Sequence, residues 1–304
     1  MLVGNRAGIG LGVKEDASIV LSDGRRLGFA EYGDPVGRPL LYFHGWPGCR
    51  LQGKALDGPA RTRRVRVIAP DRPGIGLSDP LPGRRFGDWP ADVAGLADAL
   101  GLERFHVLGV SGGGPYTLAT AARLPERVRA AAVVGGAPPL DNPADRSGMH
   151  WAYRMLASLK RTRRAMTPAV IGAGRWMVAR GDHKAPMSWL LRSVPPVDRD
   201  ALELSGGWEV VSRSFLEVAR GDAGQVAAEG ELYLQPWDFA PEEIRVPVRI
   251  WHGTADQNLP CALARRLAAR IPGATSRWIE GGGHYSLPLV YLGEILDDLL
   301  AAGG

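Results

Sequence analysis

Short apolar runs separated by glycine and proline form the pattern of the first half of the chain. These strand-length runs are apolar at nearly every position rather than at every second one. They cover residues 40–43, 65–69, 105–110 and 128–134. Such runs, alternating with helical segments, are typical of a parallel sheet that helices cover on both faces, so the pattern predicts an α/β fold.

Helical periodicity appears between these runs. Val93, Leu96 and Leu100 form the apolar side of a helix that we expect to begin near Trp89 and to end at Gly101. Further helices are predicted from about residue 51, from 113 or 114 to about 124, at 261–271 and at 287–301. Near the start of the chain, an Asp-Gly pair between the β-rich runs 18–22 and 26–32 predicts a β-hairpin.

The alternation of strand and helix stops from about residue 140 to 239. This segment reads as several irregular helices, through which large apolar side chains are scattered: Trp151, Tyr153, Met155, Trp176, Met177, Met187, Trp189 and Trp208. Alternation resumes with predicted strands at 248–251 and 276–279. We therefore expect one sheet in two parts, 1–139 and 240–304, with a helical insertion at 140–239 between them. The scattered aromatic and methionine side chains suit an apolar substrate pocket or the insertion's own core.

Length and charge limit the class of protein. The chain has 304 residues, of which 45% are hydrophobic, and can bury a large core as one domain with an insertion or as two small domains. Its formal net charge of +5 comes mostly from arginine. The densest basic runs, 61–66 and 160–164, are short and carry no recognised binding motif, so we expect exposed faces and no nucleic-acid partner.

Neither the cysteines nor the first residues of the chain suggest a special compartment. Cys49 and Cys261 are far apart and have no metal or redox spacing, so neither a disulfide framework nor a zinc site is implied. Residues 1–17 are interrupted by glycines and lack the apolar stretch of a signal peptide, and no run approaches the length of a membrane span. We expect a soluble cytoplasmic protein without a membrane partner.

The stretch Gly109-Val110-Ser111-Gly112-Gly113 carries the first chemical signal. It follows the predicted strand 105–110 and opens the next helix, which is the setting of a nucleophile elbow of the form G-x-S-x-G. The turn strains the serine backbone, and the flanking glycines let strand and helix approach closely. Because small residues surround serines in many turns, this interpretation requires a base, an acid and an oxyanion hole elsewhere in the chain.

His284 is the candidate base. It lies in a glycine-rich loop after the predicted strand 276–279 and before the last helix, from where a side chain can reach across the end of a sheet. A surface-loop histidine is the alternative. The other five histidines suit packing, loop bracing, or a substrate-contacting or solvent-exposed role in the insertion: His44, His106, His150, His183 and His252.

Asp256, in the loop after strand 248–251, is the candidate acid. The chain order Ser111, Asp256, His284 differs from the orders of chymotrypsin-like and subtilisin-like proteases. Asp141, after the strand that follows the elbow, and Asp71 are the rival carboxylates.

Acyl transfer also needs two N–H donors aimed at the developing oxyanion. The Gly112 amide directly follows the nucleophile, and the Trp46 amide lies in the loop after strand 40–43. His44 is then a residue that braces this loop.

Together these residues resemble the α/β-hydrolase superfamily. The matching motifs are His44-Gly45-Trp46-Pro47-Gly48 as the oxyanion loop, the Asp71 to Ser78 loop of the form D-x-x-G-x-G-x-S, the elbow, His252-Gly253-Thr254-Ala255-Asp256 as the acid loop, and Gly283-His284. The resemblance covers roughly residues 25 to 300 apart from the insertion. It implies a mostly parallel eight-stranded sheet and a helical cap over the active site, where 140–239 falls.

Departures from family patterns narrow the subclass. Epoxide hydrolases and haloalkane dehalogenases of this fold carry aspartate where this chain has Ser111, although Tyr153 and Tyr233 resemble part of the epoxide hydrolase pattern. Proline iminopeptidases use a different elbow. Carbon-carbon bond hydrolases, cofactor-free haloperoxidases and hydroxynitrile lyases share the Ser-Asp-His set with esterases, so the triad does not separate these classes.

The sequence therefore predicts a serine hydrolase that cleaves a carboxylic ester, lactone or thioester of a small to medium apolar molecule. His284 would take the proton of Ser111, and Asp256 would orient His284. This chemistry needs neither a metal ion nor an organic cofactor. The alternatives are a carbon-carbon bond hydrolase, a haloperoxidase-like enzyme with the same triad, or a ligand receptor without turnover. Oligomeric state and acyl preference are not predicted.

Overall fold

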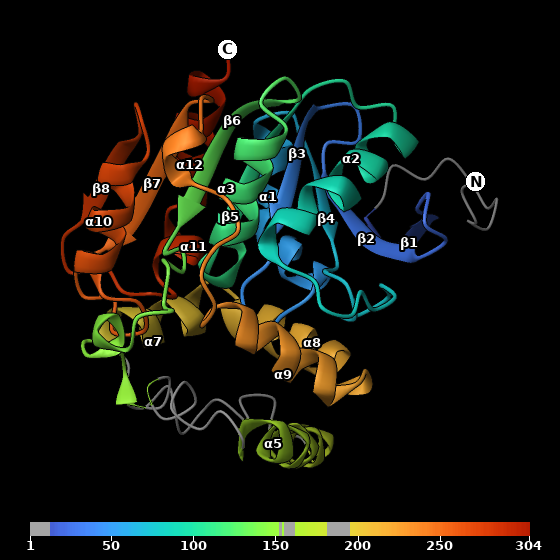
Figure 1. The fold of residues 1–304 in the computed structure, drawn as a ribbon, viewed down its shortest axis with the longest axis vertical. Coiled ribbons are helices and arrows are strands. Elements are labelled where there is room, and N and C mark those ends of the chain that lie inside the picture. Colours follow the sequence, from blue (N-terminus) through green and yellow to red (C-terminus); the bar gives the residue numbers. More distant parts are fainter. Residues whose placement is uncertain (1–12, 152–153, 155–161, 181–194) are drawn as a thin grey trace.

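One sheet forms the centre of the molecule in the computed structural model, which describes residues 13–151, 154, 162–180 and 195–304. Within these residues the sheet has eight strands in the order β1-β2-β4-β3-β5-β6-β7-β8 (Figure 1). The strands are β1 (Lys14–Val20), β2 (Arg26–Gly33), β3 (Arg38–Phe43), β4 (Val65–Pro70), β5 (Phe105–Val110), β6 (Val128–Val134), β7 (Val248–Gly253) and β8 (Thr275–Ile279).

The pairing confirms the predicted fold class. β1 and β2 form the expected antiparallel hairpin, and β2 also pairs antiparallel with β4. From β4 to β8 every pair is parallel. β5 is buried at all six positions, because helices cover both faces of the sheet at its centre.

Two hydrophobic cores lie on opposite faces of the sheet. The first contains apolar side chains of α2 (Trp89–Ala99), α3 (Gly114–Arg123) and α10 (Cys261–Arg270). The second contains those of α1 (Asp57–Thr62) and α12 (Leu292–Ala302). The remaining helical elements of this part are η1 (Arg50–Leu56), η2 (Phe86–Asp88), η3 (Ser111–Gly113), η5 (Pro241–Glu243) and α11 (Leu287–Val290).

Two predicted helices differ from the structure in detail. The helix expected from residue 51 begins as the 3-10 helix η1 and becomes α-helical only at Asp57. Pro59 offers no N–H for an α-helical bond to the preceding turn, which favours this change. The helix expected over 287–301 is divided at Tyr291, whose φ of −100° and ψ of 9° depart from helical values. Gly101 ends α2 as expected, with a φ of 66°.

No strand occurs among the described residues of 140–239. Their helices are η4 (Pro143–Arg146), α5 (Thr162–Ala179), α7 (Pro196–Leu204), α8 (Gly207–Arg220) and α9 (Ala223–Leu232). In Figure 1, α7, α8 and α9 lie across one end of the sheet, and α5 lies farther out. Trp151 and Trp176 are exposed, whereas Trp208 packs against Leu202. Tyr153, Met155, His183, Met187 and Trp189 lie outside the described residues.

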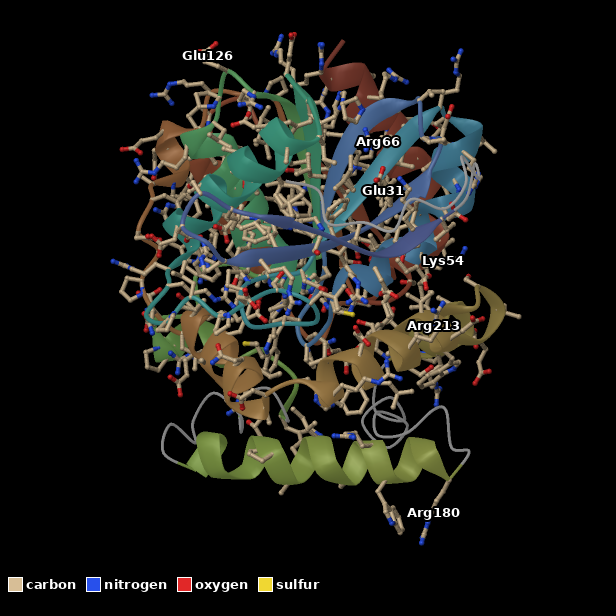
Figure 2. All side chains as sticks on the ribbon, turned by 90° about the vertical axis from the view of Figure 1, so that its right-hand side faces the viewer. Glu31, Lys54, Arg66, Glu126, Arg180 and Arg213 are labelled. Atoms are coloured by element: carbon tan, nitrogen blue, oxygen red, sulfur yellow. The ribbon has the colours of Figure 1, made fainter. Side chains whose placement is uncertain are left out.

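The basic run 61–66 is paired with carboxylates. Arg63 contacts Asp297, and Arg66 contacts Glu31 at 2.7 Å, a pair that Figure 2 labels. The run 160–164 falls outside the residues whose side chains are described. Within the described part of the chain, no helix combines the length and the hydropathy that a membrane span requires.

Candidate active site

Ser111 lies on a strained turn between β5 and α3. Its φ is 53°, in the left-handed region that residues with a side chain rarely adopt. The glycines on either side have no room for a Cβ: one on Gly109 would lie 2.4 Å from the oxygen of Gly113, and one on Gly113 would lie 2.1 Å from the oxygen of Phe43. This crowding is the physical reason for the G-x-S-x-G pattern, and the tight turn presents the serine hydroxyl at the end of the sheet.

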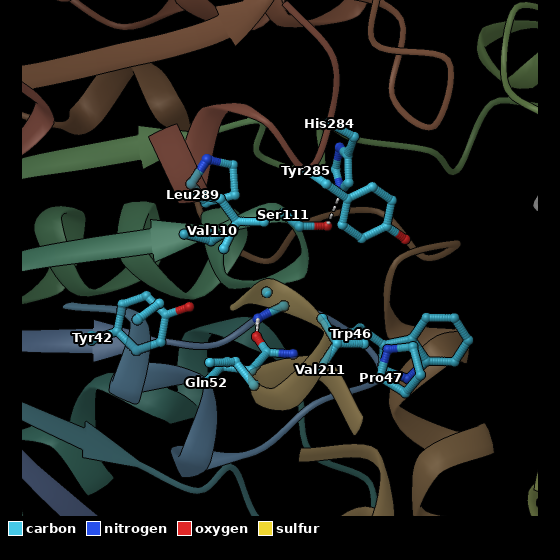
Figure 3. A pocket seen from close by; sticks show the side chains of 15 residues that line it. Tyr42, Trp46, Pro47, Gln52, Val110, Ser111, Val211, His284, Tyr285 and Leu289 are labelled. Atoms are coloured by element: carbon cyan, nitrogen blue, oxygen red, sulfur yellow. Dashed lines mark hydrogen bonds between the residues drawn. The ribbon is translucent and has the colours of Figure 1, made fainter. Parts of the chain in front are cut away.

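The three residues that the sequence predicted to act together meet at this turn. Nε2 of His284 is 2.9 Å from Oγ of Ser111 (Figure 3), and Nδ1 of His284 is 2.7 Å from Oδ2 of Asp256. The other oxygen of Asp256 accepts the amide N–H groups of Asn258 and Leu259, each at 2.9 Å. Serine, imidazole and carboxylate therefore form one hydrogen-bonded series.

Burial and charge shift the pKa values of His284 and Asp256 in opposite directions. Burial lowers the pKa of His284, but the charge of Asp256 and its hydrogen bond outweigh burial and leave the pKa above its ordinary value. Burial likewise raises the pKa of Asp256, and the charge and hydrogen bond of His284 outweigh it, so this pKa lies below its ordinary value. The pair is therefore organised to stabilise a protonated imidazole beside an ionised carboxylate.

The rival residues lie in other surroundings. Asp141 is exposed on the loop after β6. Asp71 is buried and bound to Arg50, and burial, opposed by that arginine, raises the pKa of Asp71 to about 6. His252 is buried and contacts the oxygen of Leu259 at 2.7 Å. His44 is buried with Nδ1 3.0 Å from the oxygen of Gly45, a position that suits bracing of its loop.

The two predicted oxyanion donors lie side by side. The nitrogen of Trp46 is 2.9 Å from the point that a Cβ on Gly112 would occupy. In a trans peptide the N–H points away from the preceding carbonyl, so the bonds to that carbonyl fix the direction of the N–H. The Ser111 carbonyl accepts the amide of Ala137 at 2.9 Å, and the Gly45 carbonyl accepts Arg72 at 3.2 Å. The bonds to the Ser111 and Gly45 carbonyls therefore fix the directions of the Gly112 and Trp46 N–H groups.

A buried network that the sequence analysis missed supports these amides. Arg72 is fully buried and donates to the carbonyl of His44 and to the carboxylate of Glu229, on α9. Tyr233 donates its hydroxyl to the carbonyl of Gly112 at 2.9 Å. Arg72 stands inside a matched motif and could have been singled out, whereas nothing in the sequence around Glu229 indicates that it lies beside the elbow.

A cavity of about 100 Å³ opens beside Ser111 and His284 (Figure 3). Its described walls come mainly from the loop after β3, from α8 and from the segment around α11. Most of these side chains are apolar and include Trp46, Pro47, Val210, Val211, Pro288 and Leu289. Tyr42, Gln52 and Tyr285 add polar atoms, and none of the described lining residues is Asp, Glu, Lys or Arg. The cavity therefore suits an uncharged ligand.

The described residues form no candidate metal site. No cluster of three or more His, Cys, Asp or Glu side chains among them is placed to hold a metal ion.

Comparison with known proteins matches residues 38–289 to the family model described as alpha/beta hydrolase fold. A non-heme chloroperoxidase of Streptomyces lividans is 28% identical over 88% of this chain and 92% of its own length. A 2-hydroxy-6-oxo-2,4-heptadienoate hydrolase of Pseudomonas putida is 36% identical over 40% of this chain and 45% of its own. Among solved structures, an esterase from Exiguobacterium antarcticum has a TM-score of 0.69 at 19% identity and covers 94% of this chain and 98% of its own.

Proposed function

Because the chain belongs to the alpha/beta-hydrolase fold family, we propose that it is a serine hydrolase that cleaves a carboxylic ester, lactone or thioester through an acyl-enzyme. The observation that carries the proposal is the series of two short contacts, 2.9 Å from Ser111 to His284 and 2.7 Å from His284 to Asp256. A serine hydroxyl becomes a useful nucleophile when an oriented imidazole can take its proton.

Acylation begins when Oγ of Ser111 attacks the substrate carbonyl carbon while Nε2 of His284 takes the hydroxyl proton. The carbonyl oxygen becomes an oxyanion, which the amides of Trp46 and Gly112 bind. When the intermediate collapses, His284 gives its proton to the departing alcohol or thiol, and the acyl group stays on Ser111.

Deacylation uses the same groups in reverse. His284 takes a proton from a water molecule, the resulting hydroxide attacks the acyl-enzyme, and His284 returns the proton to Oγ of Ser111 as the acid leaves. Asp256 holds the imidazole in one tautomer and stabilises its charged form without taking the proton.

The cavity supports an apolar, uncharged substrate of small to medium size. The heptadienoate on which the Pseudomonas putida relative acts is a carboxylate. The described lining residues include no arginine or lysine to pair with such a group, which favours a neutral ester or lactone.

A haloperoxidase-like activity without a cofactor is the second candidate. The similarity to a non-heme chloroperoxidase over 88% of the chain favours it. A carbon-carbon bond hydrolase and a receptor without turnover are further alternatives, since the same triad occurs in both.

The test is labelling by a fluorophosphonate, which reacts with activated serines. We expect the wild type to be labelled, Ser111→Ala to lose labelling together with a thousandfold or more of ester turnover, and the control Ser147→Ala, at an exposed serine, to keep both. A folded wild type that resists labelling would favour the receptor.

Chain-length series of p-nitrophenyl esters, lactones, a carbon-carbon substrate and a halogenation assay then separate the enzyme classes. The proposed function predicts that the esters or lactones are turned over fastest. Faster cleavage of the carbon-carbon substrate would instead indicate a carbon-carbon bond hydrolase, and halogenation without ester hydrolysis would indicate a haloperoxidase-like enzyme.

A further inference from the structure

A second buried carboxylate lies next to His284. Asp198, on α7, is 1% exposed, and its carboxylate accepts three successive backbone N–H groups. Oδ2 binds the amide of His284 at 2.8 Å, and Oδ1 binds the amides of Tyr285 and Ser286 at 2.9 and 2.8 Å. The residue that carries the imidazole is therefore tied directly to a residue of the segment 140–239.

The fit between Asp198 and this loop leaves no spare space. A Cβ on Gly283 would lie 2.3 Å from both carboxylate oxygens, so only glycine allows the loop to pass this close. The hydroxyl of Ser286 also accepts the amide of Gly283 at 2.9 Å, which closes the turn around the base. Backbone amides, rather than a basic side chain, are the partners that the described residues supply to this carboxylate.

Asp198 adds negative charge close to the imidazole. The groups that face His284 are Asp256 at Nδ1, Asp198 at the backbone, His252, which lies 3.5 Å from Asp256, and Tyr285, whose ring meets the imidazole edge-on. Burial lowers the pKa of His284, Asp256 raises it most, and Asp198 raises it further. The protonated imidazole of the proposed mechanism thus forms near two carboxylates, with Asp256 bound to the ring and Asp198 bound to the backbone of the same residue.

We propose that Asp198 is a positioning residue for the base: it fixes the loop 283–286 so that the imidazole lies between Ser111 and Asp256. In addition, its charge favours the protonated imidazole. This role rests on the proposed function, because it acts through His284 and touches no substrate. Docking of α7 then determines whether the triad is assembled.

The test compares Asp198→Asn with Asp200→Asn, which removes the same charge from an exposed position on the same helix. Asparagine places an N–H₂ group against backbone donors, so the loop loses part of its anchor. We expect Asp198→Asn to lower kcat by tenfold to about a hundredfold with little change in KM. The acid limb of its kcat/KM profile should move to lower pH, and Asp200→Asn should behave like the wild type.

Asp198→Glu separates charge from geometry, because it keeps the charge and moves it. Its acid limb should stay near that of the wild type while kcat falls. If Asp198→Asn folds, as judged by circular dichroism, and has the same acid limb as the wild type, the electrostatic part of the proposal is overturned. If the kcat of Asp198→Asn equals that of the wild type, the positioning role is overturned.

Titration of His284 by NMR keeps the test independent of turnover. The imidazole should titrate at lower pH in Asp198→Asn than in the wild type, with His284→Asn identifying the signal. If the wild type neither hydrolyses esters nor reacts with the phosphonate, the proposed function fails, and the titration still decides whether Asp198 acts on His284. An unchanged titration would remove the role assigned to Asp198.

Discussion

At the scale of single residues, the proposed chemistry depends on the protonation of His284. Only the neutral imidazole can accept the proton of Ser111. Since the net effect of burial and of Asp256 is a raised pKa, the neutral form is lost as pH falls through a value above the ordinary 6.5. In the wild type, kcat/KM for a neutral ester should therefore fall at low pH, and the midpoint of this fall should lie above pH 6.5.

Asp256→Asn tests the acid. The asparagine amide donates to Nδ1 and so favours the tautomer whose Nε2 already carries hydrogen, which cannot accept the serine proton. We expect turnover to fall by roughly a thousandfold or more, with the remaining acid limb at lower pH because the main group that raises the pKa is gone. Asp141→Asn, at an exposed carboxylate, is the control. Loss of activity in Asp141→Asn with a nearly active Asp256→Asn would transfer the acid role to Asp141.

At the scale of elements, the loop after β3 depends on a contact with α9. Arg72 binds the carbonyls of His44 and Gly45 and pairs with Glu229, and both side chains are fully or almost fully buried. Removing one partner of a buried ion pair leaves the other charge without compensation. The pair therefore links the stability of the fold to the direction of the Trp46 amide.

Arg72→Met should lower the free energy of unfolding by about 3 kcal/mol, measured by denaturant titration, because buried Glu229 would keep only its longer contact with Arg84, at 3.8 Å. The double variant Arg72→Met with Glu229→Gln should recover part of this stability, since the glutamine carries no charge to be buried. The kcat of both the single and the double variant should be lower than that of the wild type, because in both the Gly45 carbonyl lacks its bond to Arg72. Full recovery of both stability and kcat in the double variant would show that Arg72 has no effect on the oxyanion loop.

At the scale of the whole molecule, the site is assembled from both parts of the chain. Ser111, Asp256 and His284 come from loops at one end of the sheet, while α8 supplies one wall of the cavity. Substrate size should then depend on residues far in sequence from the triad.

Val211→Ala tests this dependence. The variant removes two methyl groups from the cavity wall, so kcat/KM should rise several-fold to about tenfold for longer p-nitrophenyl acyl esters relative to the acetate. Leu204→Ala, at a leucine that is 86% exposed, should leave the ratio unchanged. An unchanged ratio in Val211→Ala would place the acyl group elsewhere.

Much of the fold follows from local pattern. β5 and β6 have the predicted bounds, Phe105–Val110 and Val128–Val134, because fully apolar runs between turn residues have few other stable environments. The break at Tyr291 was not predicted, since an apolar periodicity continues across it. The boundaries of the segment 140–239 as a separate cap domain stay a prediction.

The sequence by itself determined the order of the elements and the three residues that meet at the elbow, because motif spacing and strand order place particular loops at the same sheet edge. Only the tertiary structure decided which groups hold those residues in place. Asp198 lies 86 residues before His284, and Glu229 lies 157 residues after Arg72. A buried carboxylate obtains its hydrogen-bond partners by packing against distant parts of the chain. The residues next to it in the sequence do not indicate which those partners are.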